Sequence, residues 1–157
     1  LTILNSREFG GEPVADIRVR SADLQGIDIP PALVPLAIDE FPALFVAAAC
    51  ARGRTVLRGA EELRVKESDR IQVMADGLAA IGARAEATPD GMIIDGAAYA
   101  GGIVESRGDH RIAMAFAMAA LRAGAPITIR DCANVATSFP GFVGLASRAG
   151  LPIEERA

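Results

Sequence analysis

The sequence contains no tryptophan, and aromatic residues make up only 4% of its 157 residues. It has one histidine and two cysteines, Cys50 and Cys132, with no Cys/His spacing typical of a metal site. We therefore expect no metal site. The glycine pairs match neither a Walker loop nor a dinucleotide fingerprint, and no cofactor is expected. Each cysteine lies in or beside an apolar run. We therefore expect two buried thiols, which suit a reducing cytosol better than a disulfide framework.

The sequence also lacks an excess of basic charge, because 16 Lys and Arg residues face 20 Asp and Glu residues for a net charge of -4. This balance gives no global attraction for nucleic acid. The longest nearly apolar run, residues 41–51, is too short to span a bilayer, and no basic segment precedes a long apolar stretch as in a signal peptide. We therefore expect a cytoplasmic protein with no nucleic-acid or membrane partner.

Hydrophobic residues (51%) and charged residues (23%) occur at ordinary frequencies, and the length suffices for a domain with its own core. Abundant Ala and Gly favour helices packed closely on a sheet. The chain begins at Leu1, in a segment that we interpret as a strand, without an initiator methionine. This start suggests a fragment of a longer protein.

Apolar periodicity and turn residues predict a mixed α/β (α+β) fold. Helices are expected at residues 41–51, 68–81, 110–121 and 138–149. Strands are expected at residues 14–20, 24–29, 55–57, 83–87, 91–95, 103–105, 126–129 and 151–154.

The order helix, strand, helix, strand occurs twice, with about 70 residues between equivalent positions. The helix-ending Gly53 corresponds to Gly124, and Gly82 corresponds to Gly150. The chain therefore reads as two copies of one α/β unit, at roughly residues 12–95 and 96–157. Charged or polar residues cluster at the starts of all four helices, where free backbone N–H groups favour anions. If equivalent helices point the same way, these clusters meet on one surface.

The string RVKESDR, residues 64–70, carries the first set of candidates. Lys66, Glu67 and Arg70 precede or begin the second helix, for which Ser68 is the expected N-cap. A cation at a helix N-terminus is locally unfavourable, so a compensating carboxylate or bound phosphate is expected. The alternative is a solvated, ion-paired helix start with no function.

The other candidates flank the first and third helices. Asp39 is either a helix cap or a carboxylate that acts on a substrate hydroxyl. Asp109 is either a plain N-cap of the third helix or part of the functional cluster, and the sequence favours neither interpretation. Arg111 begins an almost wholly apolar helix and needs an anionic partner, for which its planar fork suits phosphate or carboxylate. His110 is either a hydrogen-bond donor or a packed ring, and Met114 and Met118 on this helix are expected in the core.

Taken together, these strings resemble one family, the 5-enolpyruvylshikimate-3-phosphate (EPSP) synthases. The matching segments are GEPVAD (residues 11–16), IDEFP (38–42), LRVKESDRI (63–71), DHRIAM (109–114) and ATSFP (136–140). The sequence is most similar to the bacterial subgroup that tolerates glyphosate. The resemblance implies the inside-out barrel of the enolpyruvyl transferases, in which six βαβαββ units form two domains. About two units lie in this chain, as the C-terminal part of one domain, and the partner domain is absent from it.

The resemblance also implies roles for the candidates. Asp39 matches the carboxylate that contacts the 5-hydroxyl of shikimate 3-phosphate and is a proposed general base. Lys66 matches a lysine near that hydroxyl and is the alternative proton carrier. Glu67 matches the acid proposed to protonate the methylene carbon of phosphoenolpyruvate (PEP). Arg70 and Arg111 match arginines that bind PEP.

Two further positions are less clear. His110 matches a histidine of uncertain role. Thr137 stands where many members have a lysine that contacts PEP, although the tolerant subgroup also lacks that lysine.

The implied reaction transfers an enolpyruvyl group from PEP to shikimate 3-phosphate in aromatic amino-acid biosynthesis. A complete, monomeric enzyme is expected to need the missing N-terminal part, so this chain alone is expected to be inactive. One rival is the transferase that uses a UDP-N-acetylglucosamine acceptor, against which RVKESDR and DHR argue. The other is a non-catalytic fragment that binds anions or nothing.

Overall fold

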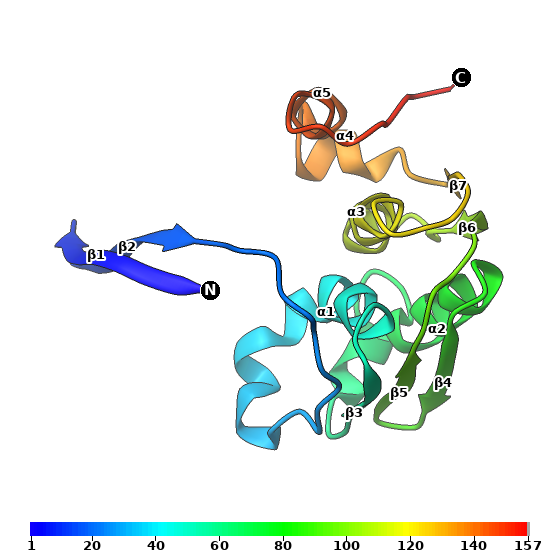
Figure 1. Ribbon diagram of the computed structural model, residues 1–157, viewed down its shortest axis with the longest axis horizontal. Coiled ribbons are helices and arrows are strands. Elements are labelled where there is room, and N and C mark those ends of the chain that lie inside the picture. The colour runs from blue at the N-terminus through cyan, green and yellow to red at the C-terminus, as the bar shows by residue number, and fades with distance from the viewer. Residues whose placement is uncertain (157) are drawn as a thin grey trace.

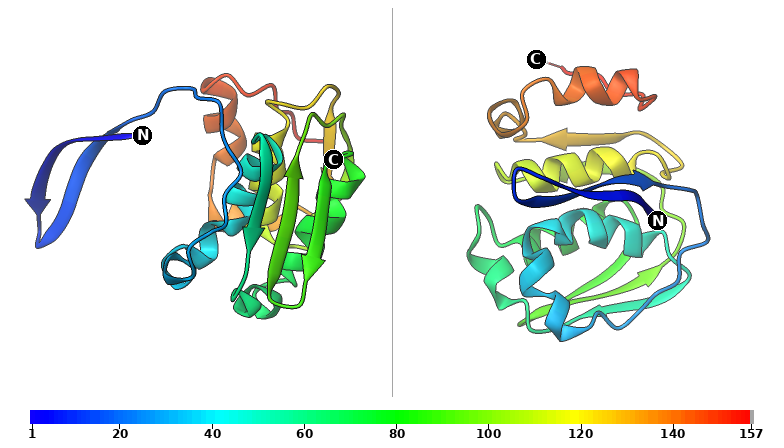
Figure 2. Two further views of the ribbon diagram at one scale, coloured as in Figure 1. Left: turned by 60° about the horizontal axis from the view of Figure 1, so that its bottom comes forward. Right: turned by 90° about the vertical axis from the view of Figure 1, so that its left-hand side faces the viewer.

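The computed structural model describes residues 1–156. The first two strands, β1 (Thr2–Phe9) and β2 (Glu12–Arg18), form an antiparallel hairpin that extends away from the body of the molecule (Figures 1 and 2). Gly10 and Gly11 form its turn with positive φ angles of 61° and 86°, which suit glycine. Apolar side chains on this hairpin are exposed, among them Phe9 at 77% and Ile17 at 67%.

Residues 31–96 form the lower part of the body in Figure 1. Two 3-10 helices, η1 (Pro31–Leu33) and η2 (Pro35–Glu40), lead into α1 (Phe41–Ala49), and β3 (Gly53–Leu57) follows. A third 3-10 helix, η3 (Glu61–Val65), precedes α2 (Arg70–Ala80), β4 (Arg84–Thr88) and β5 (Gly91–Gly96). The three strands form an antiparallel sheet in the order β3-β5-β4.

The next elements are β6 (Gly102–Glu105), α3 (His110–Ala119) and β7 (Ile127–Arg130). Strands β6 and β7 pair in parallel on either side of α3 in the sequence. Two short helices, α4 (Asn134–Ser138) and α5 (Phe142–Arg148), lie over α3 at the top of Figure 1.

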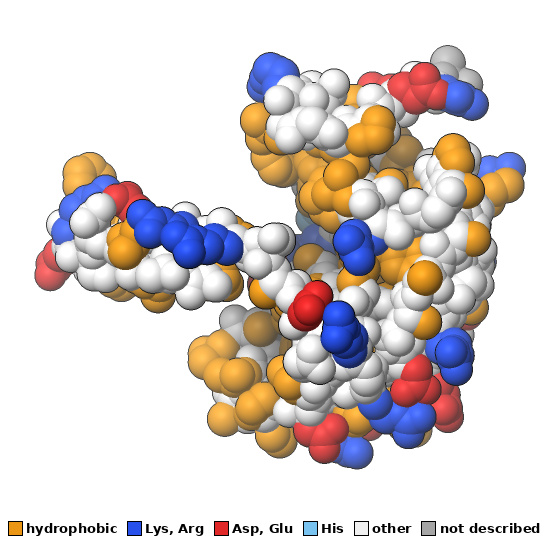
Figure 3. All heavy atoms as spheres, viewed as in Figure 1, with side chains coloured by type: hydrophobic (Ala, Val, Ile, Leu, Met, Phe, Trp, Pro, Cys, Tyr) orange, Lys and Arg blue, Asp and Glu red, His pale blue; other side chains and the backbone are white. Residues whose placement is uncertain are grey.

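Helices α1, α2 and α3 contact one another and form the centre of the larger of two hydrophobic clusters. Gly77 of α2 lies close against α3, since a Cβ atom there would lie 2.4 Å from the ring of Phe116. Tyr99 is buried and donates a hydrogen bond to the carbonyl oxygen of Ala119 at 3.1 Å. Its hydroxyl also lies 3.3 Å from the sulfur of Cys50. Apolar side chains remain exposed over η1 and η2 (Figure 3), including Leu33 and Leu36.

The mixed α/β class and the four helical regions are confirmed, but several local predictions are wrong. The expected helix at residues 138–149 is interrupted by Pro140 and Gly141, and the latter has a φ of 81°. Residues 151–154 form no strand, and residues 24–29 contribute only isolated bridges to the β3 segment. The N-cap of α2 is Asp69, because its carboxylate accepts from the backbone N–H of Gln72, and not Ser68.

The burial predictions for the two thiols and the two methionines also fail. Cys132 is exposed and Cys50 is only partly buried, so the thiols are not a buried pair. Met114 is partly buried and Met118 is 39% exposed, because both line an open cavity beside α3 rather than the core.

Within residues 1–156, no helix is long and apolar enough to cross a membrane, and no group of three or more potential ligands is arranged to hold a metal ion.

Candidate active site

The structure brings five of the predicted site residues into one ion-pair network. They come from four places in the fold: the end of η2, the loop after η3, and the starts of α2 and α3. The convergence of helix starts expected from the repeat is therefore observed for three of the four clusters. The five residues are Asp39, Lys66, Glu67, Arg70 and Arg111.

Arg70 lies at the centre of this network. It is the first residue of α2, and its side chain is only 1% exposed. Its Nε donates to Asp109 Oδ2 at 2.8 Å, its Nη1 to Asp39 Oδ1 at 3.0 Å and its Nη2 to Glu67 Oε2 at 2.5 Å. These three carboxylates offset both the loss of water and the unfavourable helix dipole. Burial opposes the charge of Arg70, but the hydrogen bond from Arg70 to Asp109 and the nearby carboxylates outweigh it and raise the pKa of the guanidinium.

Asp39 lies where the three cations meet. Besides its bond from Arg70, it lies 3.8 Å from Lys66 Nζ and 3.6 Å from Arg111 Nη2. Partial burial opposes its ionisation. The hydrogen bond from Arg70 and the positive charge of Arg111 outweigh this effect, so the pKa of Asp39 lies below its ordinary value. Lys66 adds to the same shift, and Asp39 is therefore a carboxylate at neutral pH.

Lys66 has a second partner, Glu62, which was not among the predicted site residues. Its ammonium group donates a short hydrogen bond to Glu62, one turn earlier. This bond is the largest influence on Lys66 and raises the pKa of its ammonium group, with a further contribution from the charge of Asp39. Lys66 is thus a cation at neutral pH, and its side chain is 22% exposed.

Arg111 is the most accessible arginine of the network, with a side chain that is 33% exposed. Its Nη1 donates to the carbonyl oxygen of Asp39 at 3.0 Å and lies 3.4 Å from Glu40 Oε1. It lines a cavity of about 140 Å³ between α1, α3 and α5. Charged groups line one part of this cavity, and the rest is apolar, with Met114, Met118 and Phe142 in its wall.

The two remaining candidates stand apart from the network. His110 is the first residue of α3 and is partly buried, and Thr137 is exposed on α4. Within residues 1–156, neither side chain makes a hydrogen bond or ion pair. The structure therefore does not bring the fourth helix start into the cluster.

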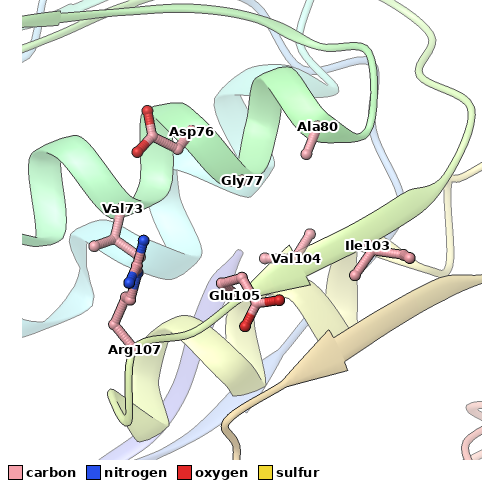
Figure 4. Close-up of a pocket in the computed structure, with 8 residues that line it drawn as sticks. All are labelled: Val73, Asp76, Gly77, Ala80, Ile103, Val104, Glu105 and Arg107. Carbon is pink, nitrogen blue, oxygen red and sulfur yellow. The ribbon is translucent and has the colours of Figure 1, made fainter.

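A second cavity, of about 180 Å³, lies between α2 and β6 (Figure 4). None of the predicted site residues lines it, and its walls carry Asp76, Glu105 and Arg107 beside an apolar floor that includes Val104. The charged network and its adjoining cavity are therefore the better candidate for a site.

Comparison with known proteins identifies the family. The family model described as EPSP synthase (3-phosphoshikimate 1-carboxyvinyltransferase) matches residues 4–145. A 3-phosphoshikimate 1-carboxyvinyltransferase of Methylococcus capsulatus is 69% identical over 98% of the chain and 35% of the relative. One of Acidithiobacillus ferrooxidans is 72% identical over 94% of the chain and 34% of the relative.

Solved structures give the same result. An EPSP synthase of Acinetobacter baumannii, at 59% identity, superimposes with a TM-score of 0.94 over 98% of this chain and 36% of that one. The chain spans about a third of the length of the curated relatives it matches. With a family model matching most of its residues, the chain belongs to the EPSP synthase family.

Proposed function

We propose that the complete protein containing these residues transfers the enolpyruvyl group of PEP to the 5-hydroxyl of shikimate 3-phosphate and releases phosphate. The observation that carries the proposal is the meeting of Asp39 and Glu67 around one guanidinium, beside two further cations. Enolpyruvyl transfer needs a carboxylic acid for carbon, a base for a hydroxyl, and positive charge for PEP.

The proposed roles of Asp39 and Lys66 follow from their protonation states, and the role of Glu67 follows from its match to the acid of the family. Glu67, as the acid, protonates C3 of PEP, and the hydroxyl of shikimate 3-phosphate attacks the cationic C2 while its proton passes to a base. Asp39 is the better base, because it is ionised and partly exposed, whereas Lys66 is held as an ammonium ion by Glu62. The tetrahedral adduct then expels phosphate as Glu67 reclaims the proton from C3. Lys66 contributes positive charge near the hydroxyl.

The two arginines differ in how they can bind PEP. Arg111 has accessible surface and faces the cavity, so it can bind an anion directly. Arg70 is almost fully enclosed, so it can bind PEP only after Asp39 or Glu67 leaves one of its terminal nitrogens. Thr137 supplies no cation, and the proposal places no PEP contact there. Membership of the glyphosate-tolerant subgroup stays a prediction, as do a role for His110, a cytoplasmic location and a monomeric complete enzyme.

Charge balance supports the expectation that this chain alone has little activity. The three cations of the network face five carboxylates, so the site carries an excess of negative charge. PEP itself carries about three negative charges, which require several cationic partners. The remaining two thirds of the protein must therefore supply further basic residues and exclude water from the reacting groups. The carboxylates are Asp39, Glu40, Glu62, Glu67 and Asp109.

The direct test joins this chain to the upstream part of the Methylococcus capsulatus relative, in place of the segment it matches. This complete chimaera should release phosphate only when PEP and shikimate 3-phosphate are both present, and the product should carry one added enolpyruvyl group by mass. The intact relative is the positive control, and UDP-N-acetylglucosamine is the alternative acceptor. A folded chimaera that is inactive, or that prefers the UDP-sugar, would contradict the proposal. The isolated 157-residue chain should show little phosphate release, and release at the rate of the chimaera would refute the expectation of inactivity.

A further inference from the structure

Asp109 is the one carboxylate of the network with no access to solvent, since its exposure is 0%. It uses both oxygens. Oδ1 accepts from the backbone N–H groups of Arg111 at 2.9 Å and Ile112 at 3.4 Å, and so caps α3. Oδ2 accepts from Arg70 Nε at 2.8 Å and from the Ser68 hydroxyl at 3.2 Å. One side chain thus fixes the start of α3 to the start of α2.

This attachment determines the direction of the Arg70 fork. Because Nε is bonded to Asp109 at the buried end, Nη1 and Nη2 point outward to Asp39 and Glu67. A planar guanidinium with one edge fixed cannot rotate without breaking that bond. The position of the two carboxylates proposed to move protons therefore depends on a group that touches neither of them.

We propose that Asp109 is a positioning residue of the enolpyruvyl transfer reaction, which acts through Arg70. It sets the guanidinium fork that positions Asp39 and Glu67, and that receives the substrate carboxylate when one of them moves away. The inference rests on the proposed function. The charged groups around this unit come from four elements: Asp39 and Glu40 at the end of η2, Glu62 in η3, Lys66 and Glu67 in the loop, and Arg111 on α3.

Asp69 provides a matched control within the same seven-residue string. Its Oδ1 caps α2 through Gln72 N–H at 3.0 Å, and its Oδ2 accepts from Arg64 Nη1 at 2.6 Å. Each aspartate therefore caps a helix with one oxygen and pairs with an arginine through the other. The two aspartates differ in burial, since the Asp69 side chain is 37% exposed, and in their arginines. The other nitrogens of Arg64 donate to the backbone carbonyls of Pro89 and Thr88 instead of to functional carboxylates.

The experiment compares Asp109→Asn with Asp69→Asn in the complete chimaera. Asparagine retains an oxygen for the helix cap, but it cannot compensate an arginine charge. For Asp109→Asn we expect kcat/KM for PEP to fall at least about tenfold, while KM for shikimate 3-phosphate stays within about threefold. For Asp69→Asn we expect every constant to stay within about threefold. A general loosening of the fold would instead raise the KM values of both substrates.

A double-mutant cycle identifies the route of the effect. Arg70→Lys keeps the charge but loses the fork, so Asp109→Asn should cost little more when added to Arg70→Lys. Independent losses that multiply would overturn the proposal, as would wild-type kinetics in Asp109→Asn or equal losses in Asp69→Asn.

Two further outcomes separate the causes of failure. If Asp109→Asn does not fold, Asp109→Ser replaces it, because serine is a good N-cap without charge. If neither folds, Asp109 acts in folding and the positioning role is wrong. An unsubstituted chimaera that makes no product would refute the proposed function itself, whereas an active chimaera with no Asp109 effect would refute only this inference.

Discussion

Replacing Arg70 by methionine should destabilise the isolated chain far more than the same substitution at the surface residue Arg54. Methionine keeps much of the apolar stem but removes the charge, which leaves Asp109 with no cation at 0% exposure. Removing one partner from a buried ion pair costs about 3–5 kcal/mol. Asp39 and Glu67 add less, because their side chains are 46% and 51% exposed and water can solvate them.

The control is Arg54→Met. Arg54 makes two hydrogen bonds to Asp95, at 2.7 and 3.0 Å, but its side chain is 62% exposed. An ion pair in this setting contributes little to stability, because water screens both charges. Urea unfolding followed by circular dichroism gives both free energies, and unchanged m values would show that the two variants unfold from comparable states.

A further substitution tests the cause of the loss. If Arg70→Met is costly because Asp109 remains as an unpaired buried charge, then Arg70→Met combined with Asp109→Asn should be more stable than Arg70→Met alone. The reasoning is refuted if Arg70→Met costs no more than Arg54→Met, or if the second substitution adds a further loss of its own.

Three other predictions concern the rest of the chain. Burial, and then the hydrogen bond with Cys50, raise the pKa of Tyr99 above its ordinary 10.0. Because Tyr99 is the only tyrosine, the folded chain should show no phenolate absorbance at about pH 11. The same shift means that the folded state should lose stability only above the pKa of the unfolded tyrosine. Gly77→Ala should lower the free energy of unfolding by about 1–3 kcal/mol through a clash with Phe116, whereas Gly144→Ala in α5, where only a side-chain end lies 3.5 Å away, should raise it by up to about 1 kcal/mol. Because the pKa of Asp39 is lowered, its carboxylate contributes stability that is present above the ordinary value of 3.8 and is lost below it. The urea midpoints of the wild type and Asp39→Asn should therefore differ less at about pH 3 than at about pH 7. Phenolate absorbance near pH 10 in the folded chain, equal effects of the two alanines, or a difference that grows on acidification would each contradict the corresponding expectation.

Local patterns predicted the elements whose determinants are local. The helices at residues 41–49 and 110–119 follow from apolar runs with Pro42 or Asp109 at their starts. The strands predicted at residues 14–20 and 151–154 depend on more than a local pattern, because a strand also needs a partner. Residues 12–18 find one in residues 2–9, across a two-glycine turn. Residues 151–154 pair with no strand in the described part of the chain, so their alternating pattern led to a wrong prediction.

In the candidate site, too, some features follow from local sequence and others depend on contacts with distant residues. Charged residues at helix starts, in a duplicated order, were enough to predict that Asp39, Lys66, Arg70 and Arg111 lie together, and their side chains do so. The ion pair of Asp109 with Arg70 could not be predicted from the sequence, because the two residues lie 39 positions apart. Nothing in the string DHR distinguishes a plain helix cap from a cap that also pairs with an arginine. Glu62 was also missed, although an acidic residue four positions before a lysine is a recognised helical pairing signal.

Placing an arginine at the first position of α2 opposes the helix dipole, and the network explains how the fold tolerates it. Without Arg70, Asp39, Glu67 and Asp109 would repel one another, and with it each accepts one hydrogen bond from a different nitrogen. The fork therefore already binds carboxylates, two of them on partly exposed side chains that can move into water. Under the proposed function, a substrate carboxylate replaces either one without a change in the geometry of the arginine. An anion site that is filled by movable carboxylates of the protein keeps its guanidinium oriented before the substrate arrives, which reduces the reorganisation that binding requires.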